Sequence, residues 1–150
     1  MAAFRKVHGM EIQQGKDAPA RRAPHGYMKD HDQVNVIRRY PHVHEGKGAI
    51  DVKFFFRGEK AAEPALFLIY TIPPGASEGV HVHKPGDAGL GSFDEFYYII
   101  CGSGEMEIEG ERVPVKAGDH VLTPNGVSHG IENTSADGDL KVYLLAMIRD

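Results

Sequence analysis

The sequence lacks the features that mark secreted and membrane proteins. Cys101 is its one cysteine among 150 residues, so no disulfide can form within the chain. A single cysteine is compatible with a reducing compartment. Every apolar run is shorter than the roughly 20 residues that span a bilayer, and residues 1–8 lack the apolar stretch of a secretion signal. We expect a soluble, cytoplasmic protein with no membrane partner.

The sequence also lacks a basic excess. Its 17 lysines and arginines are outnumbered by 21 acidic residues, which gives a formal charge of −4. Binders of nucleic acid carry clustered positive charge, and the one basic cluster here, Arg21-Arg22 followed by Lys29, is too short for that role. The charge pattern predicts no nucleic-acid partner.

The chain has many turn residues and many short apolar segments. Residues 1–33 contain Pro19 and Pro24 and show no periodic spacing of apolar residues. This predicts an N-terminal arm packed on the main domain. From Val34 onward the segments are rich in β-branched and aromatic residues and are separated by turn signals. They are residues 34–40, 50–56, 65–72, 80–83, 95–101, 105–109, 112–115, 120–123, 130–133 and 141–148.

This pattern predicts an all-β domain, a sandwich or a barrel, over residues 34–150. No segment in that range shows the 3.6-residue period of an amphipathic helix. Residues 141–148 have some helical propensity, but their neighbours favour a strand. A single domain of this length can bury an apolar core without disulfides.

Two pairs of histidines stand out among the nine in the chain. His81 and His83 are two residues apart, so on a strand both imidazoles point to the same face. They could both ligate one metal ion if that face is the interior, although an isolated pair of this kind is usually on a solvated surface. His42 and His44 have the same spacing beside Pro41 and Gly46, and we interpret that pair as part of a surface loop.

The surroundings of His81 and His83 resemble the two motifs of the cupin superfamily, in the right order, between residues 65 and 148. In the first motif, Gly75 is followed after five residues by His81-Val82-His83, and Glu95 is followed after six residues by Gly102. In the second motif, Gly118 is followed after five residues by Pro124-Asn125-Gly126, then by His129 and Asn133 at their expected spacings.

The resemblance implies a double-stranded β-helix, also called a jelly-roll barrel, here preceded by extra strands and the arm. It implies one divalent metal near a mouth of the barrel, bound by His81, His83, Glu95 and His129. Three imidazoles and a carboxylate suit Zn, Fe, Mn, Ni or Cu, and the sequence does not choose among them. Octahedral coordination would leave two positions for water or substrate.

The chain departs from the family pattern between His83 and Glu95, where residues 84–94 replace a usual spacing of three or four. Asp87 and Asp94 are alternative acidic ligands, but Glu95 keeps the expected spacing to Gly102. The insertion also contains Leu90 and Phe93. It is either a lid over the metal or a surface loop packed against the barrel or against a partner subunit.

Three further residues are candidate catalytic groups, which would move a proton. Strand alternation turns either Tyr97 or Tyr98 toward the interior, and His120 lies in a short strand within the second motif.

Three functions agree with this site. The first is a metalloenzyme that uses the ion as a Lewis acid on a small oxygenated substrate, in an isomerase, lyase or cyclase reaction. The second is a metal-dependent dioxygenase, and the third is a non-catalytic ligand-binding cupin. We also expect a homodimer, by resemblance to small cupins and because residues 34–56 could extend a sheet across a two-fold axis.

Overall fold

The computed structural model describes residues 11–12, 37–54, 65–87 and 90–149. The expected arm, residues 1–33, therefore lies outside the described residues except for β1, Glu11–Ile12, which pairs with β2. Of the barrel expected over residues 34–150, residues 34–36, 55–64, 88–89 and 150 also lie outside the description.

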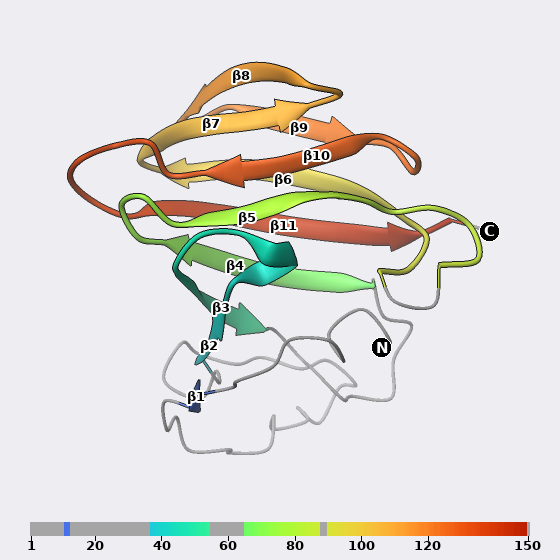
Figure 1. The fold of residues 1–150 in the computed structure, drawn as a ribbon, viewed down its shortest axis with the longest axis horizontal. Coiled ribbons are helices and arrows are strands. Elements are labelled where there is room, and N and C mark those ends of the chain that lie inside the picture. The colour runs from blue at the N-terminus through green and yellow to red at the C-terminus, as the bar shows by residue number, and fades with distance from the viewer. Residues whose placement is uncertain (1–10, 13–36, 55–64, 88–89, 150) are drawn as a thin grey trace, which may run out of the picture.

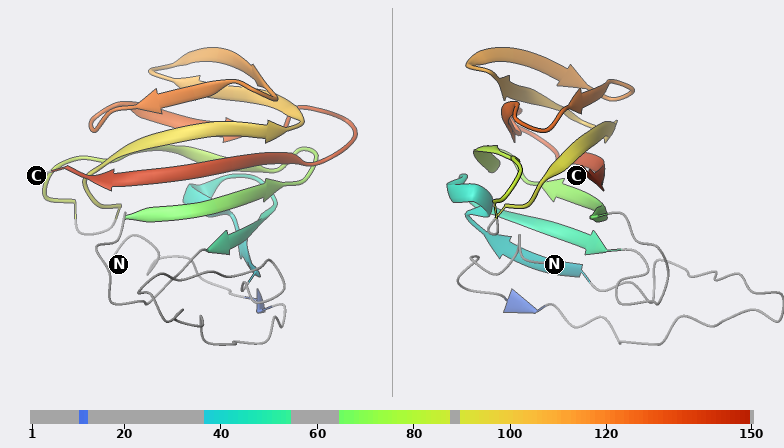
Figure 2. Two further views of the ribbon diagram at one scale, coloured as in Figure 1. Left: turned by 180° about the vertical axis from the view of Figure 1, so that it is seen from behind. Right: turned by 90° about the vertical axis from the view of Figure 1, so that its right-hand side faces the viewer.

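Two antiparallel sheets make up the described structure (Figures 1 and 2). The larger has seven strands in the order β1-β2-β3-β4-β11-β6-β9, and the smaller has four in the order β5-β10-β7-β8. The strands after β1 are β2 (Ile37–Pro41), β3 (Ala49–Phe54), β4 (Leu66–Ile72), β5 (Ser77–Val82), β6 (Phe93–Cys101), β7 (Ser103–Ile108), β8 (Glu111–Lys116), β9 (His120–Thr123), β10 (Ser128–Glu132) and β11 (Leu140–Ile148).

The core lies between the inner faces of the two sheets. Side chains alternate along β6 and β11, so that every second residue is buried up to Ile99 and Ala146. Tyr97 and Ile99 of β6 are 1% and 0% exposed, and Leu144 of β11 is 0% exposed. Met106 and Ile131 of the smaller sheet complete the same cluster.

The all-β jelly-roll expected from the sequence is confirmed. Residues 141–148 belong to strand β11, as their neighbours indicated. Within the described ranges the one helical element is a short 3₁₀ turn, η2 (Val43–Glu45). No helix in that part of the chain is both long enough and apolar enough to cross a membrane.

A β-bulge in β5 interrupts the simple alternation beside the first motif. His129 of β10 pairs with His81, but Ile131, two residues further on, pairs with Glu78, so Gly79 and Val80 together lie opposite Gly130. A bulge of this kind redirects the side chains that follow it. Glu78 and His81 are three residues apart, yet both are buried, at 2% and 7% exposure.

The last residue of the second motif holds two turns together. Asn133 is fully buried, and its amide donates to the carbonyls of Ile72 (2.8 Å) and Gly138 (2.9 Å). Its side-chain oxygen accepts hydrogen bonds from the backbone N–H and the hydroxyl of Ser135. One amide thus joins the end of β4 to the connection before β11.

We predict that Asn133→Ala lowers the free energy of unfolding by about 2–3 kcal/mol, because it removes a buried amide that donates to the Ile72 and Gly138 carbonyls and accepts from Ser135. Urea denaturation monitored by circular dichroism measures the change. Thr134→Ala, at the exposed neighbouring position, is the control and is expected to change stability by less than about 0.5 kcal/mol. Equal stability of the two variants would contradict the role given to Asn133.

Candidate metal centre

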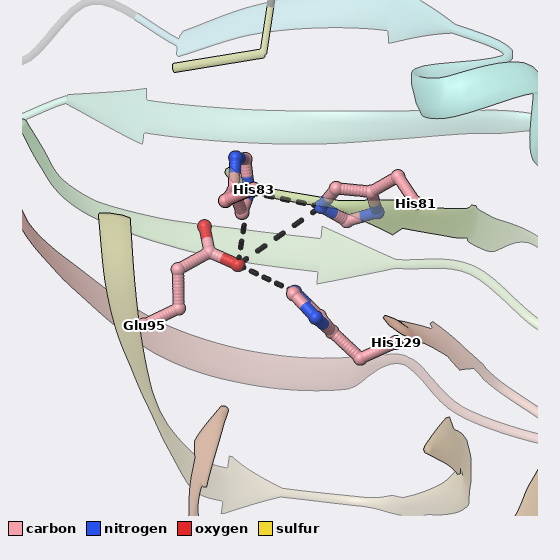
Figure 3. A group of neighbouring side chains, drawn as sticks. All are labelled: His81, His83, Glu95 and His129. Carbon is pink, nitrogen blue, oxygen red and sulfur yellow. Dashed lines mark hydrogen bonds and ion pairs between the residues drawn. The ribbon is translucent and has the colours of Figure 1, made fainter. Parts of the chain in front are cut away.

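Four side chains from the two motifs converge inside the barrel (Figure 3). His81 lies on β5 and His83 directly after it, Glu95 on β6 and His129 on β10. They are 7%, 3%, 1% and 1% exposed. One ligand atom from each lies within 4.8 Å of the others. The four residues expected to bind metal are therefore brought together, and the cluster could hold an ion.

The spacing of the ligand atoms fits a single ion. Two ligands at right angles, each about 2.1 Å from an ion, are about 3.0 Å apart, and two on opposite sides are about 4.2 Å apart. His81 Nε2 is 3.1 Å from His83 Nε2, and Glu95 Oε2 is 3.3 Å from His83 Nε2. Glu95 Oε2 is 2.7 Å from His129 Nε2 and 4.0 Å from His81 Nε2.

Backbone carbonyls orient all three imidazoles. The Nδ1 atom of His81 lies 2.8 Å from the Gly79 carbonyl oxygen, that of His83 2.8 Å from Leu90 and that of His129 2.9 Å from Val127. A neutral imidazole that donates its Nδ1 hydrogen to a carbonyl presents the lone pair of Nε2. Each Nε2 points to the centre of the cluster, which is the arrangement that metal ligation requires.

The charge of Glu95 dominates the electrostatics of the cluster. Burial works to raise the pKa of Glu95, but hydrogen bonds from His129 and His83 hold it well below its usual range. A ring that donates to a carbonyl through Nδ1 can donate to Glu95 through Nε2 only when it carries a second proton, and a metal ion on Nε2 would displace that proton. Burial works to lower the pKa values of His83 and His129, but the Glu95 carboxylate raises both. His81 lies farther from Glu95, and burial lowers its pKa to about 3. The centre therefore holds a carboxylate ready to ligate a cation.

A second buried carboxylate lies beside the first. Glu78 accepts hydrogen bonds from the hydroxyls of Tyr70 (3.1 Å) and Tyr97 (3.2 Å). The Tyr97 hydroxyl also lies 3.0 Å from Glu95, so it bridges the two acids. Burial, and then the nearby charge of Glu95, raise the pKa of Glu78 to about 7.

The interpretation of His44 as a surface residue is wrong. Its ring stacks on His81 with a centroid separation of 3.8 Å and an interplanar angle of 17°. Its side chain is 15% exposed, and burial lowers its pKa to about 4. His42, by contrast, is exposed, as expected. A sequence signal was present, because the pair repeats the His-x-His spacing, but nothing local shows that η2 packs against β5.

The candidate catalytic residues divide between the two faces of β6. Tyr97 is buried and touches Glu95, whereas Tyr98 is 47% exposed on the outer face. His120 pairs with Tyr98 in the register of β6 and β9 and is also exposed. The structure brings Tyr97 to the cluster but not Tyr98 or His120.

The insertion after His83 contacts the cluster at two points. The Leu90 carbonyl accepts the hydrogen bond from His83, and the Phe93 ring lies 4.9 Å from the His83 ring. Neither alternative acid reaches the centre. Asp87 caps the backbone N–H of Leu90, and Asp94 binds Arg149 at 2.7 Å. A lid function for the insertion remains a prediction.

A jelly-roll barrel with a buried cluster of three histidines and a glutamate is the architecture of a metal-binding cupin. The cupin domain family model matches residues 68–146, and the chain belongs to that family.

Three proteins illustrate the similarity. An oxalate-binding protein from Thermotoga maritima is 38% identical over 111 residues, which are 73% of this chain and 84% of that protein. A crystal structure from Thermotoga maritima, described as a predicted oxalate decarboxylase, is 33% identical with a TM-score of 0.66, over 75% of this chain and 92% of that one. A cupin 2 conserved barrel domain protein from Salinispora arenicola, 23% identical with a TM-score of 0.54 over 65% and 75% of the two chains, shares the fold.

We predict that His81→Ala combined with His83→Ala abolishes stoichiometric metal binding, because it removes two of the four ligands. Elemental analysis and titration of the chelator-treated protein with Mn²⁺ or Zn²⁺ measure the loss. His42→Ala combined with His120→Ala removes two exposed histidines and is expected to retain full binding. A double variant at the cluster that binds metal as tightly as the parent would overturn the assignment.

Proposed function

We propose that this chain binds one divalent metal ion through His81, His83, Glu95 and His129, and that the ion holds oxalate or a closely similar small carboxylate. The observation that carries the proposal is the convergence of three carbonyl-oriented Nε2 atoms and one Glu95 oxygen on a single point. The names of the two Thermotoga maritima relatives, one oxalate-binding and one a predicted oxalate decarboxylase, support the choice of ligand.

The charges of the site favour a divalent ion. Glu95 and Glu78 are both buried, and the Tyr97 hydroxyl bridges them. When both are ionised, their two negative charges equal the charge of one divalent cation, and a buried charge is costly unless it is compensated. Zn, Fe, Mn, Ni and Cu all remain compatible with this donor set.

The chain's own residues limit what can follow binding. A bound divalent ion supplies Lewis acidity to two adjacent oxygens of the ligand. Tyr97, Glu78 and His44 lie beside the cluster and can carry a proton without being ligands. We propose Lewis-acid chemistry of the lyase or isomerase type as the reaction class, and simple ligand binding or a dioxygenase reaction as the alternatives.

Ligand binding to metal-loaded and metal-free protein tests the proposal. We expect isothermal titration calorimetry with oxalate to show stoichiometric binding after loading with Mn²⁺ or Zn²⁺, and at least about tenfold weaker binding after chelation. Succinate, whose carboxylates are too far apart to chelate through adjacent oxygens, is the control ligand. Equal oxalate affinity with and without metal would contradict the proposal, as would metal-loaded protein that binds no oxalate.

The outer face of the seven-stranded sheet supports the expectation of a homodimer. Phe96, Tyr98, Ile100, Leu122 and Met147 point away from the core and are 41–52% exposed. Phe96 pairs with Leu122 across β6 and β9, so these side chains adjoin one another. Contiguous apolar patches with aromatic residues and methionine are typical of protein interfaces. We propose that a second copy covers this outer apolar face by two-fold symmetry.

We predict a dimeric mass for the parent by multi-angle light scattering at micromolar concentration. Leu122→Glu places a charge in the outer apolar face and is expected to shift the mass to that of a monomer. Val80→Glu is the matched control, because Val80 is 49% exposed on the other sheet and its variant should stay dimeric. A monomeric parent would contradict the proposed assembly.

A further inference from the structure

The turn that carries His44 has an uncommon backbone conformation. φ is 50° at His42, 48° at His44 and 64° at Glu45. Residues other than glycine rarely adopt this left-handed backbone conformation, and it persists where surrounding contacts impose it. Hydrogen bonds within the turn, from the His42 N–H to the Gly48 carbonyl and from the Gly46 N–H to the Val43 carbonyl, and contacts with β5 hold this conformation.

The turn is fixed to β5 by hydrogen bonds to Ser77 and by a close approach that leaves no room for a side chain at two glycines. The Lys47 N–H donates to Ser77 Oγ (2.7 Å), and the Ser77 N–H donates to the Lys47 carbonyl (2.8 Å). A Cβ atom added at Gly46 would lie 2.0 Å from the backbone carbonyl oxygen of Ser77. One added at Gly79 would lie 1.9 Å from the backbone carbonyl oxygen of His44. These two glycines therefore allow η2 to lie directly against the strand that carries His81.

This packing places the His44 imidazole on the flank of the metal cluster. The ring stacks on His81 and lies 6.4 Å from the ring of His83. Its Nε2 atom is 3.7 Å from Glu78 Oε1, which is too long for a hydrogen bond. No hydrogen bond to the His44 ring is found within the described residues. A neutral imidazole has one N–H donor and one acceptor, so His44 keeps a donor for a ligand.

His44 is better placed to contact a ligand than to bind the ion. A site made of His44, Glu78 and His81 would need His81 as its third member. The His81 Nδ1 atom is bonded to the Gly79 carbonyl, and its Nε2 atom faces His83 within the main cluster. Without His81, only two ligands are left on this side.

We propose that His44 determines the ligand specificity of the centre by donating a ring N–H to an oxygen of oxalate that does not touch the ion. Oxalate has four oxygens, and chelation through one oxygen of each carboxylate leaves two others to be hydrogen-bonded. Acetate has no second carboxylate and cannot make the same paired contacts. This inference rests on the proposed function and adds to it the residue that distinguishes a dicarboxylate from a monocarboxylate.

Oxalate and acetate titrations of the metal-loaded His44→Phe variant test the inference. Phenylalanine keeps the ring that stacks on His81 but removes both nitrogens. Loss of one hydrogen bond to a charged ligand is expected to weaken oxalate binding about 10- to 100-fold and to leave acetate binding and metal content unchanged. His42→Phe is the matched control, since His42 lies in the same turn with a similar φ and is exposed, and its Nδ1 atom lies 3.0 Å from the Gly46 carbonyl oxygen. His44→Ala is the second variant, for use if phenylalanine disturbs the turn.

The outcomes separate this inference from the proposed function. Oxalate affinity equal to the parent's in both His44 variants would overturn the inference alone. Loss of metal from both His44 variants would assign His44 to holding His81 in place and would overturn the donor role. Parent protein that holds metal but binds no oxalate would overturn the proposed function, and this inference with it.

Discussion

The buried charge of Glu95 is the constraint on which the rest of the centre depends. A carboxylate that is 1% exposed between two apolar sheets is costly unless cations or hydrogen-bond donors surround it. Here His129, His83 and Tyr97 all direct polar atoms at it. The surrounding apolar core keeps the effective dielectric low, which strengthens each of these interactions and would equally strengthen the attraction for a metal cation.

The sequence predicted the parts of the centre that follow from strand geometry and motif spacing. His81 and His83 share a face because side chains on a strand repeat every two residues. The insertion of residues 84–94 leaves Glu95 in place because most of it lies in the connection before β6, and its last two residues, Phe93 and Asp94, begin that strand. Alternation also predicted that one of Tyr97 and Tyr98 faces inward, but not which one. The phase of the short strand β9 was equally open, and His120 faces outward.

The features that the sequence did not predict arise from contacts between distant segments. Glu78 would face away from His81 in a regular strand, and the bulge opposite Gly130 turns it inward. His44 reaches His81 from a turn more than thirty residues earlier in the chain, through contacts at Gly46 and Gly79. The periodicity of side chains along a strand describes one segment at a time. It does not identify a residue whose role depends on how two segments pack.

The three carbonyl acceptors of the histidine Nδ1 atoms have a consequence for how such a centre can change. No point mutation deletes a backbone carbonyl. The orientation of each imidazole is therefore kept after a substitution at Gly79, Leu90 or Val127, as long as the local backbone keeps its conformation. The surroundings of Glu95 are different, because Tyr97 and Glu78 contact it or one another through side chains. Side-chain substitutions can therefore alter the carboxylate side of the centre directly, whereas the orientation of the imidazoles depends on the backbone alone.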